Sequence, residues 1–394
     1  MTVAYIVDGV RTAFGKAGGA IAGVRPDDLA ATVMSTLVER NPSIDPSAIE
    51  DVYWGATNQS GDDSRNVARI SAVLAGLPHT VAGASVNRLC GSGLESVVQA
   101  ARAVKSGELD VCIAGGSESM SRAPFILPRA DSAYQRAQPV WDSRLGWRSI
   151  NPQWKAQYGA RTLLECAEIT AEQYSVTREE QDAIAVRSHR LAAAAWESGL
   201  LAGETIPVVV EGRALLTIDQ SVRPDATMES IGALRPLVSA DGGVTAGNAS
   251  PMSDGASGMV IVSEDAVNRW GLTPRARIVG GASVGVDPDG LDGPVPSTRR
   301  LCEKIGWSTE SFDAVEMTEA YASQVVACVR ELHFDLEIVN PWGGAIAIGH
   351  PLGASGSRLL NTLVSRLEHS GGRRGLATMC IGVGQGISVA VERC

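Results

Sequence analysis

Several features that mark other classes of protein are missing from this 394-residue sequence. No block of basic residues interrupts its formal net charge of −10, so we expect no nucleic-acid partner. No apolar run is long enough to span a membrane, and charge breaks the opening segment too early for a signal peptide. We therefore expect no membrane association and a cytoplasmic protein. The length suffices for two or three domains with a large buried core.

Cofactor motifs are missing as well. The seven cysteines show no paired short spacings, which argues against a disulfide framework and against a zinc site. Neither a phosphate-cradling GxxxxGKS/T pattern nor a GxGxxG pattern in a βαβ context occurs. We therefore expect no metal and no nucleotide cofactor. Unpaired cysteines suit a reducing compartment, in which a catalytic thiol survives.

The most informative residue that is present is Cys90. It lies in residues 86–93, where a short apolar segment gives way to a glycine-rich turn and then to an amphipathic helical pattern. At the start of a helix, unpaired N–H groups and the helix dipole favour a thiolate. Gly91 and Gly93 leave room for another molecule to approach the sulfur. The alternative is a small buried cysteine that only packs.

Two further segments have the residues that such a sulfur would need. Residues 340–356 place His350 between glycine and proline, ahead of an amphipathic helix, and residues 377–386 place Cys380 between a strand-like run and a glycine turn. An imidazole near Cys90 can take the thiol proton or stabilise the thiolate. A second thiol at Cys380 can move a proton to or from carbon or sulfur.

The sequence also repeats itself. The regions after residues 86–87 and 339–340 each contain a glycine-rich loop, an amphipathic helix, a Ser-Gly turn and a strand that ends in Cys-Ile and glycine. This pattern predicts two α/β halves, whose loops bring Cys90 against His350 and Cys380. Residues 121–251 differ in composition, with helical patterns at 165–174 and 178–198, and a plain helical insertion is one interpretation of them.

Five segments resemble, in order and spacing, the signatures of the thiolase family across essentially the whole chain: residues 86–93, 115–121, 248–250, 349–351 and 380–382. Two further stretches, 58–69 and 146–159, are more similar to the β-ketoadipyl-CoA thiolase branch than to the short-chain biosynthetic branch. The resemblance implies an α/β fold of two duplicated halves in layered α-β-α-β-α arrangement. It also implies an N-terminal half at 1–120, completed by about 252–274, a loop domain over CoA at 121–251 and a C-terminal half at 275–394.

The resemblance implies a CoA-dependent acyltransferase that cleaves a 3-ketoacyl-CoA to acetyl-CoA and a shortened acyl-CoA, or runs the reverse Claisen condensation. The mechanism would be ping-pong, with Cys90 acylated, His350 activating it and Cys380 donating and accepting the proton at the second substrate. The N–H groups of Cys90 and Gly382 would hold the oxygen of the acyl-enzyme, and His350 would help hold that of the CoA thioester.

By the same resemblance, Ser250 lies near the pantetheine arm of CoA, and Arg223 and Ser230 lie near its nucleotide end. Coenzyme A is then a substrate and no separate cofactor is needed. The expected partners are acyl-CoA, CoA and further copies of this chain in a homodimer or homotetramer.

Two positions depart from the family pattern. Thr318 stands where thiolases usually carry an asparagine that anchors a water beside the histidine, and a hydroxyl is a shorter anchor. Trp342 replaces a smaller polar residue and either reshapes the acyl pocket or only packs. The departure at Thr318 keeps open a condensing enzyme or hydrolase with an altered oxyanion hole. A non-catalytic acyl-CoA binding protein is a third hypothesis, although it would need none of the three reactive residues.

Overall fold

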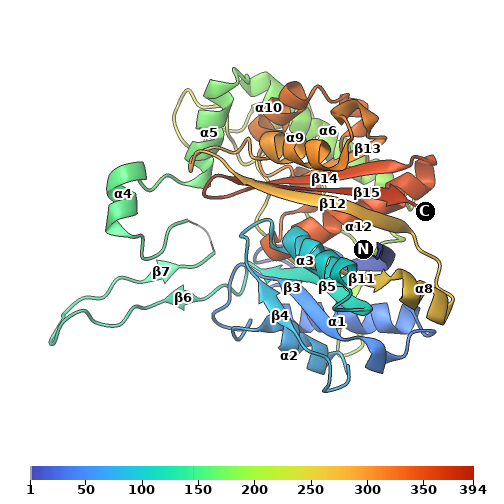
Figure 1. The fold of residues 1–394 in the computed structure, drawn as a ribbon. Coiled ribbons are helices and arrows are strands. Elements are labelled where there is room, and N and C mark those ends of the chain that lie inside the picture. The colour runs from blue at the N-terminus through green and yellow to red at the C-terminus, as the bar shows by residue number, and fades with distance from the viewer. Residues whose placement is uncertain (1, 145) are drawn as a thin grey trace.

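The computed structural model describes residues 2–144 and 146–394 (Figure 1). In the N-terminal half, the strands follow the order β4-β3-β5-β11-β1. Strand β3 runs parallel to β4 and β5, whereas β11 runs antiparallel to β5 and β1. The bounds are β1 Ala4–Thr12, β3 Asp51–Gly55, β4 Ala84–Val86, β5 Val111–Ser119 and β11 Ser253–Ser263. Two short strands, β2 (Gly15–Lys16) and β8 (Thr205–Ile206), pair with β11 and β1.

The C-terminal half repeats this arrangement. Its strands follow the order β13-β14-β15-β12. Strand β13 runs parallel to β14 and is also bridged to Val339. In the N-terminal half, β3 pairs in the same way with β5 on one side and β4 on the other. The bounds are β12 Ala276–Gly285, β13 Ala314–Met317, β14 Arg374–Ile381 and β15 Gln385–Arg393. Two residue pairs between β1 and β12 join the halves into one sheet. The sequence repeat therefore corresponds to a repeat of topology.

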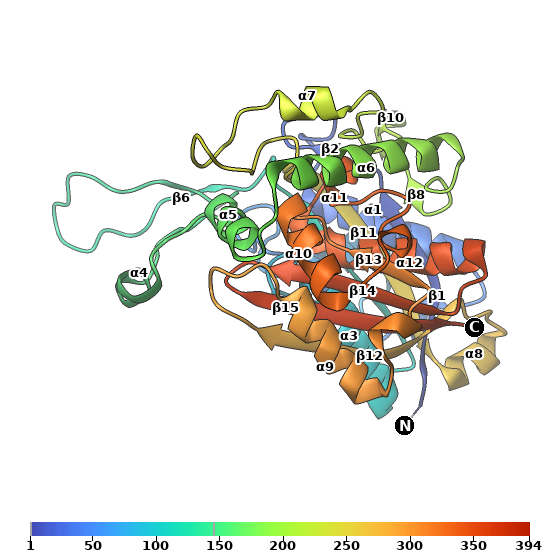
Figure 2. The same cartoon turned by 90° about the horizontal axis from the view of Figure 1, so that it is seen from above.

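Two helices lie between the halves, α3 (Ser92–Ser106) and α12 (Leu352–Ser370) (Figures 1 and 2). Both are ended by a left-handed glycine, Gly107 and Gly371, at the two predicted Ser-Gly turns. Their apolar side chains join those of both sheets in one core, which is why the predicted apolar faces are buried. This core holds the loops that carry the reactive residues.

The remaining helices cover the outer faces of the two halves. Helices α1, α2 and α8 lie on the N-terminal half, and α9 and α10 on the C-terminal half (Figure 1). Their bounds, with the short helices, are α1 Pro26–Arg40, η1 Pro46–Ala48, α2 Val67–Leu74, α8 Glu264–Trp270, α9 Pro294–Ile305, η2 Thr309–Ser311, α10 Ala322–Leu332, η3 Leu336–Ile338 and α11 Ala345–Ile348.

The inserted segment between the halves has its own helices. Helices α5 (Leu163–Gln173) and α6 (Arg178–Glu197) match the predicted helical patterns, and each begins with a capping box, at Thr162 and Thr177. Helix α6 packs against α10 and α11 of the C-terminal half. The other elements are β6 Phe125–Ile126, β7 Trp141–Asp142, α4 Pro152–Tyr158, β9 Val208–Val210, β10 Arg213–Leu216 and α7 Met228–Gly232.

Part of this insert forms an arm that projects from the body of the molecule and contains β6, β7 and α4 (Figures 1 and 2). The limits 1–120, 121–251 and 275–394 for three domains stay a prediction. Within the described residues, no helix combines the length and the apolar character needed to cross a bilayer.

Candidate active site

A cavity of about 420 Å³ opens where the loops of the two halves meet the inserted segment. Cys90, His350 and Cys380 all lie in its wall. They come from the loop after β4, the loop before α12 and the end of β14, which are three separate parts of the chain. The remaining lining residues are Lys16, Ala17, Met120, Leu163, Leu164, Arg223, Leu237, Ala246, Ala249, Ser250, Pro251, Met252, Leu291, Ala320, Tyr321, Leu352 and Gly382.

Cys90 directly precedes Gly91, the residue that caps the N-terminus of α3. A side chain at Gly91 would press on Ile381 and Ile387, so glycine is required for this close approach. Burial raises the pKa of the Cys90 thiol to about 11, although N–H groups of Gly382 and of Cys90 itself act in the opposite direction. The N–H groups therefore act in favour of the thiolate, as expected, but desolvation outweighs them and the resting form is the thiol.

His350 is buried and its ring is oriented by Ser355. Ser355 Oγ lies 2.6 Å from His350 Nδ1 and donates its own proton to the Pro351 carbonyl at 3.1 Å. Nδ1 must then carry the ring proton, which leaves the lone pair on Nε2. Nε2 has no hydrogen-bond partner among the described residues. Burial, assisted by Arg358, lowers the pKa of His350 to about 4, so the imidazole is a neutral proton acceptor near pH 7.

Cys380 is the penultimate residue of β14 and is also buried. Burial raises its pKa well above the ordinary value, and the neighbouring sulfur of Cys90 acts in the same direction. It therefore rests as a thiol, the form that can give a proton to carbon. Gly382 follows two residues later in the cavity wall, and its N–H is directed at the Cys90 sulfur. This N–H could therefore donate a hydrogen bond to a thioester oxygen on Cys90.

Thr318 lies directly after β13, where it is 1% exposed. Its N–H donates to the Thr378 carbonyl at 3.0 Å, but its Oγ1 has no partner within the described part of the chain. A buried hydroxyl without a partner is uncommon, since leaving it unpaired is unfavourable. The Thr318 hydroxyl is therefore free to form a hydrogen bond. Thr318 precedes Ala320 and Tyr321 in the chain by two and three residues, and both of these residues line the cavity.

The three residues that we expected to contact CoA are in different surroundings. Arg223 and Ser250 line the cavity. Ser230 lies in the first turn of α7, where its Oγ accepts from the Thr227 N–H at 2.9 Å as part of a capping box. It is not among the cavity-lining residues of the described chain. The structure thus gives Ser230 a local structural contact, and a contact with CoA stays a prediction.

Sequence reasoning missed some residues that line or support the site. Lys16 lies in β2 and lines the cavity, although nothing in its local pattern distinguishes it from a surface lysine. Ser355 lies in the same glycine-rich segment as His350. Its position five residues after His350 was the feature of the sequence that could have indicated a contact between them. Leu163 and Leu291 contribute apolar wall from the inserted segment and from the loop before α9.

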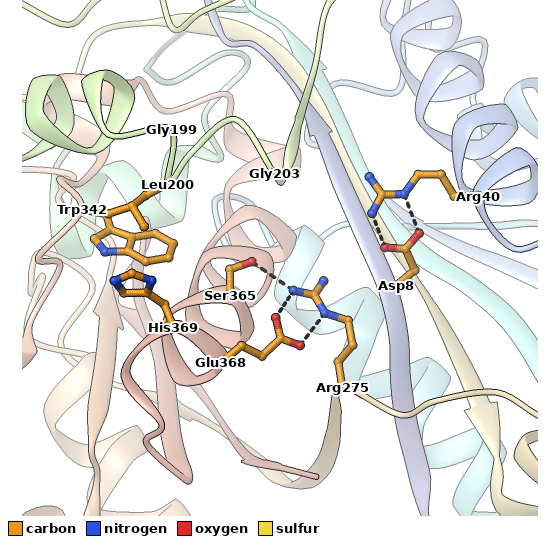
Figure 3. A pocket seen from close by; sticks show the side chains of 10 residues that line it. All are labelled: Asp8, Arg40, Gly199, Leu200, Gly203, Arg275, Trp342, Ser365, Glu368 and His369. Carbon is orange, nitrogen blue, oxygen red and sulfur yellow. Dashed lines mark hydrogen bonds and ion pairs between the residues drawn. The ribbon is translucent and has the colours of Figure 1, made fainter.

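Trp342 does not reach this cavity. It is 7% exposed and packs against a separate apolar cluster that includes Ala192 and Leu201. Figure 3 shows its ring beside His369 in a second cavity, of about 390 Å³. The charged side chains of that cavity neutralise one another, since Arg40 pairs with Asp8 and Arg275 with Glu368 (Figure 3). The hypothesis that Trp342 only packs is therefore the one that its position supports.

Comparison with known families gives two consecutive matches. Residues 4–265 match the model described as "Thiolase, N-terminal domain". Residues 272–393 match the model described as "Thiolase, C-terminal domain". Together they span nearly the whole chain.

Curated relatives are similar over their full lengths. The β-ketoadipyl-CoA thiolase of Pseudomonas aeruginosa is 50% identical over 99% of this chain and 98% of its own. The 3-oxoadipyl-CoA/3-oxo-5,6-dehydrosuberyl-CoA thiolase of Escherichia coli is 48% identical over all of both chains.

Solved structures agree with the fold. The acetyl-CoA acetyltransferase of Bacillus anthracis superposes with a TM-score of 0.93 at 35% identity, over 100% of this chain and 99% of that one. Human mitochondrial 3-ketoacyl-CoA thiolase, solved with CoA, gives the same TM-score and identity over 100% and 98% of the two chains. The predicted fold class is thereby confirmed.

Proposed function

Since this chain belongs to the thiolase family, we propose that it cleaves a 3-oxo dicarboxylyl-CoA through an acyl-enzyme on Cys90. It is a thiolase-type acyltransferase, in which CoA accepts the acyl group. One observation carries the assignment of the site: two thiols and a neutral imidazole from three separate segments line one cavity. A non-catalytic acyl-CoA binder would not need them.

In the first half-reaction, the Cys90 thiol gives its proton to His350 Nε2 and the sulfur attacks C3 of the substrate. The C2–C3 bond then breaks, the acyl group stays on Cys90 as a thioester, and the electron pair passes to C2. The Cys380 thiol protonates C2, so acetyl-CoA leaves and Cys380 becomes a thiolate. The N–H groups of Cys90 and Gly382 hold the oxygen on the carbon attached to Cys90.

In the second half-reaction, His350 first passes its proton to the Cys380 thiolate, and the thiol of free CoA then gives its own proton to His350 Nε2. The CoA sulfur attacks the acyl carbonyl, the bond to Cys90 breaks, and the shortened acyl-CoA leaves. Cys90 then regains the proton that His350 held. Every proton and electron pair is accounted for by Cys90, His350 and Cys380, so the proposed reaction needs no metal or other cofactor.

The charge of the cavity supports an anionic substrate. Lys16 and Arg223 line it, and no acidic side chain of the described residues does. Neither cation forms a side-chain ion pair or hydrogen bond within the described chain, so both are free to meet an anion. One anion is a phosphate of CoA, and a second is the distal carboxylate of a dicarboxylyl chain. The names of the curated relatives favour this substrate class.

A substrate panel tests this proposal. We expect kcat/KM to be higher for 3-oxoadipyl-CoA than for acetoacetyl-CoA. We also expect Lys16→Met to reduce kcat/KM for 3-oxoadipyl-CoA about ten-fold more than kcat/KM for acetoacetyl-CoA. An equal reduction for both would assign Lys16 to CoA instead of the acyl chain. Turnover of acetoacetyl-CoA alone, with no cleavage of the dicarboxylyl substrate, would contradict the substrate class.

A second candidate function is hydrolysis of the acyl-enzyme. The free hydroxyl of Thr318 is the observation that favours it. Water would then replace CoA in the second half-reaction. Release of the shortened acid in the absence of free CoA, at a rate that CoA does not increase, would identify the hydrolase.

We also propose a cytoplasmic homodimer or homotetramer. Strand β4 is the edge of its sheet, and the projecting arm exposes the large apolar side chains of Phe125, Leu127 and Tyr134. Unpaired strand edges and exposed apolar patches are typical of subunit contacts. Light scattering at micromolar concentration is expected to give twice or four times the mass of the chain. A reducing compartment suits the enzyme because Cys90 must stay a thiol.

A further inference from the structure

A buried amide connects Cys380 with a third cysteine. Gln324 occupies the first turn of α10 and is 0% exposed. The Cys380 Sγ lies 3.6 Å from Gln324 Oε1, and Gln324 Nε2 lies 3.5 Å from the Sγ of Cys328. Cys328 is one turn further along the same helix and is also 0% exposed. The three side chains thus form a buried chain that ends at the proposed proton donor.

A primary amide has one end that accepts hydrogen bonds and one end that donates them. In the observed orientation, the Cys380 S–H donates to Oε1 and the Nε2 N–H donates to Cys328. Rotation of the amide by half a turn would exchange the two ends. An N–H would then face Cys380, and the oxygen would accept from the S–H of Cys328. Both orientations leave each end of the amide with a partner.

We propose that Gln324 is a positioning residue for Cys380, and that its amide turns as Cys380 changes between thiol and thiolate. The inference rests on the proposed function, in which Cys380 passes through both forms. As a thiol, Cys380 donates to Oε1, which directs its sulfur. After its proton has gone to C2 of the substrate, the negative sulfur accepts from Nε2–H. The proton that then arrives from His350 restores the first orientation.

Cys328 is suited to the far end of this chain. Burial raises its pKa to about 12, so it keeps its S–H throughout the cycle. A thiol both donates and accepts, and it therefore satisfies either end of the amide. An apolar residue at position 328 would leave one amide end unpaired in both orientations, so the amide would no longer be held in line with Cys380.

The experiment measures exchange of the acetyl-CoA methyl hydrogens with solvent as a function of pH, beside the rate of Cys90 acylation. Gln324→Met keeps the volume but removes both hydrogen bonds. We expect it to slow exchange about ten- to a hundred-fold and to move the midpoint of the pH profile upward, because the thiolate loses its N–H donor. Acylation of Cys90 should stay within about three-fold of the parent, since that step uses Cys90 and His350.

Ser323→Ala is the matched control. It removes one buried hydrogen bond, to the Ala167 carbonyl, from the same turn of α10, and Ser323 forms no hydrogen bond with either cysteine. We expect it to leave both rates and the pH midpoint unchanged. If Gln324→Met reduces acylation and exchange equally, or leaves the exchange midpoint in place, Gln324 is only structural and the inference is overturned.

A second pair of variants decides the matter if Gln324→Met does not fold. Cys328→Ser keeps a group that donates and accepts, whereas Cys328→Ala does not. We expect Cys328→Ser to exchange near the parent rate and Cys328→Ala to exchange several-fold more slowly; equal rates would overturn the inference. Failure of the parent enzyme to acylate Cys90 or to exchange at all would instead contradict the proposed function.

Discussion

Burial keeps both Cys90 and His350 uncharged in the resting enzyme. The pKa of the thiol is raised to about 11 and that of the imidazole is lowered to about 4. A thiolate-imidazolium pair would require the opposite order of pKa values. The proton transfer from sulfur to nitrogen must therefore accompany attack on the substrate. A desolvated thiolate formed at that moment is a strong nucleophile.

This order of pKa values predicts how Cys90 reacts with iodoacetamide. In Cys380→Ser enzyme, alkylation of the Cys90 peptide, followed by mass spectrometry, should increase continuously from pH 6 to pH 10. The thiolate fraction grows throughout that range when the folded-state pKa lies above it. A plateau between pH 5 and pH 8 would indicate a stable ion pair with His350 and contradict the neutral resting state.

The Thr318 hydroxyl has no hydrogen-bond partner among the described residues. If the only effect of the threonine is a weaker water anchor, Thr318→Asn should raise the rate of the CoA-ester step roughly ten-fold. Acylation of Cys90 should change little, because the acyl oxygen is held by the N–H groups of Cys90 and Gly382. Separate single-turnover measurements of the two steps check this. A loss of thiolysis would show that the site is shaped around the hydroxyl.

At the scale of elements, the two central helices approach each other through glycines. A Cβ at Gly356 of α12 would collide with the backbone of Leu94 in α3, and one at Gly93 would collide with α12. These glycines permit backbone-to-backbone packing between the two halves. The same packing positions Cys90 at the start of α3 and His350 just before α12.

Gly356→Ala should therefore lower the free energy of unfolding by about 1–3 kcal/mol, because the added methyl group forces α3 and α12 apart. Gly232→Ala is the matched control, since it also lies in a helix but meets only an ordinary contact at 3.9 Å. Denaturant unfolding compares the two variants. Equal stability of Gly356→Ala and Gly232→Ala would contradict the tight packing of the central helices.

Much of this element level could be predicted from the sequence. The apolar faces of α3 and α12, the glycine that ends each helix and the capping threonine of α6 are local patterns. They are predictable because the physical causes lie within a few residues. The net rise in the pKa of Cys90 was not predictable in this way, since it depends on burial by distant segments.

At the scale of the whole molecule, the repeat of topology explains how distant segments form one site. The two halves place equivalent loops on the same cavity, so Cys90 comes from one and His350 and Cys380 from the other. The similarity between the two repeated segments could be recognised in the sequence. The contribution of Lys16 and the contact between Gln324 and Cys328 were not, because they depend on side-chain positions in the folded core.

The proposed reaction depends above all on Cys90 as the carrier of the acyl group. Incubation of the enzyme with acetyl-CoA, rapid quenching in acid and mass spectrometry of the peptides tests it most directly. We expect an acetyl adduct on Cys90 in the parent enzyme and in Cys380→Ser, and a much slower appearance of that adduct in His350→Asn. An adduct confined to Cys380, with Cys90 unmodified, would show that Cys90 is not the acyl carrier.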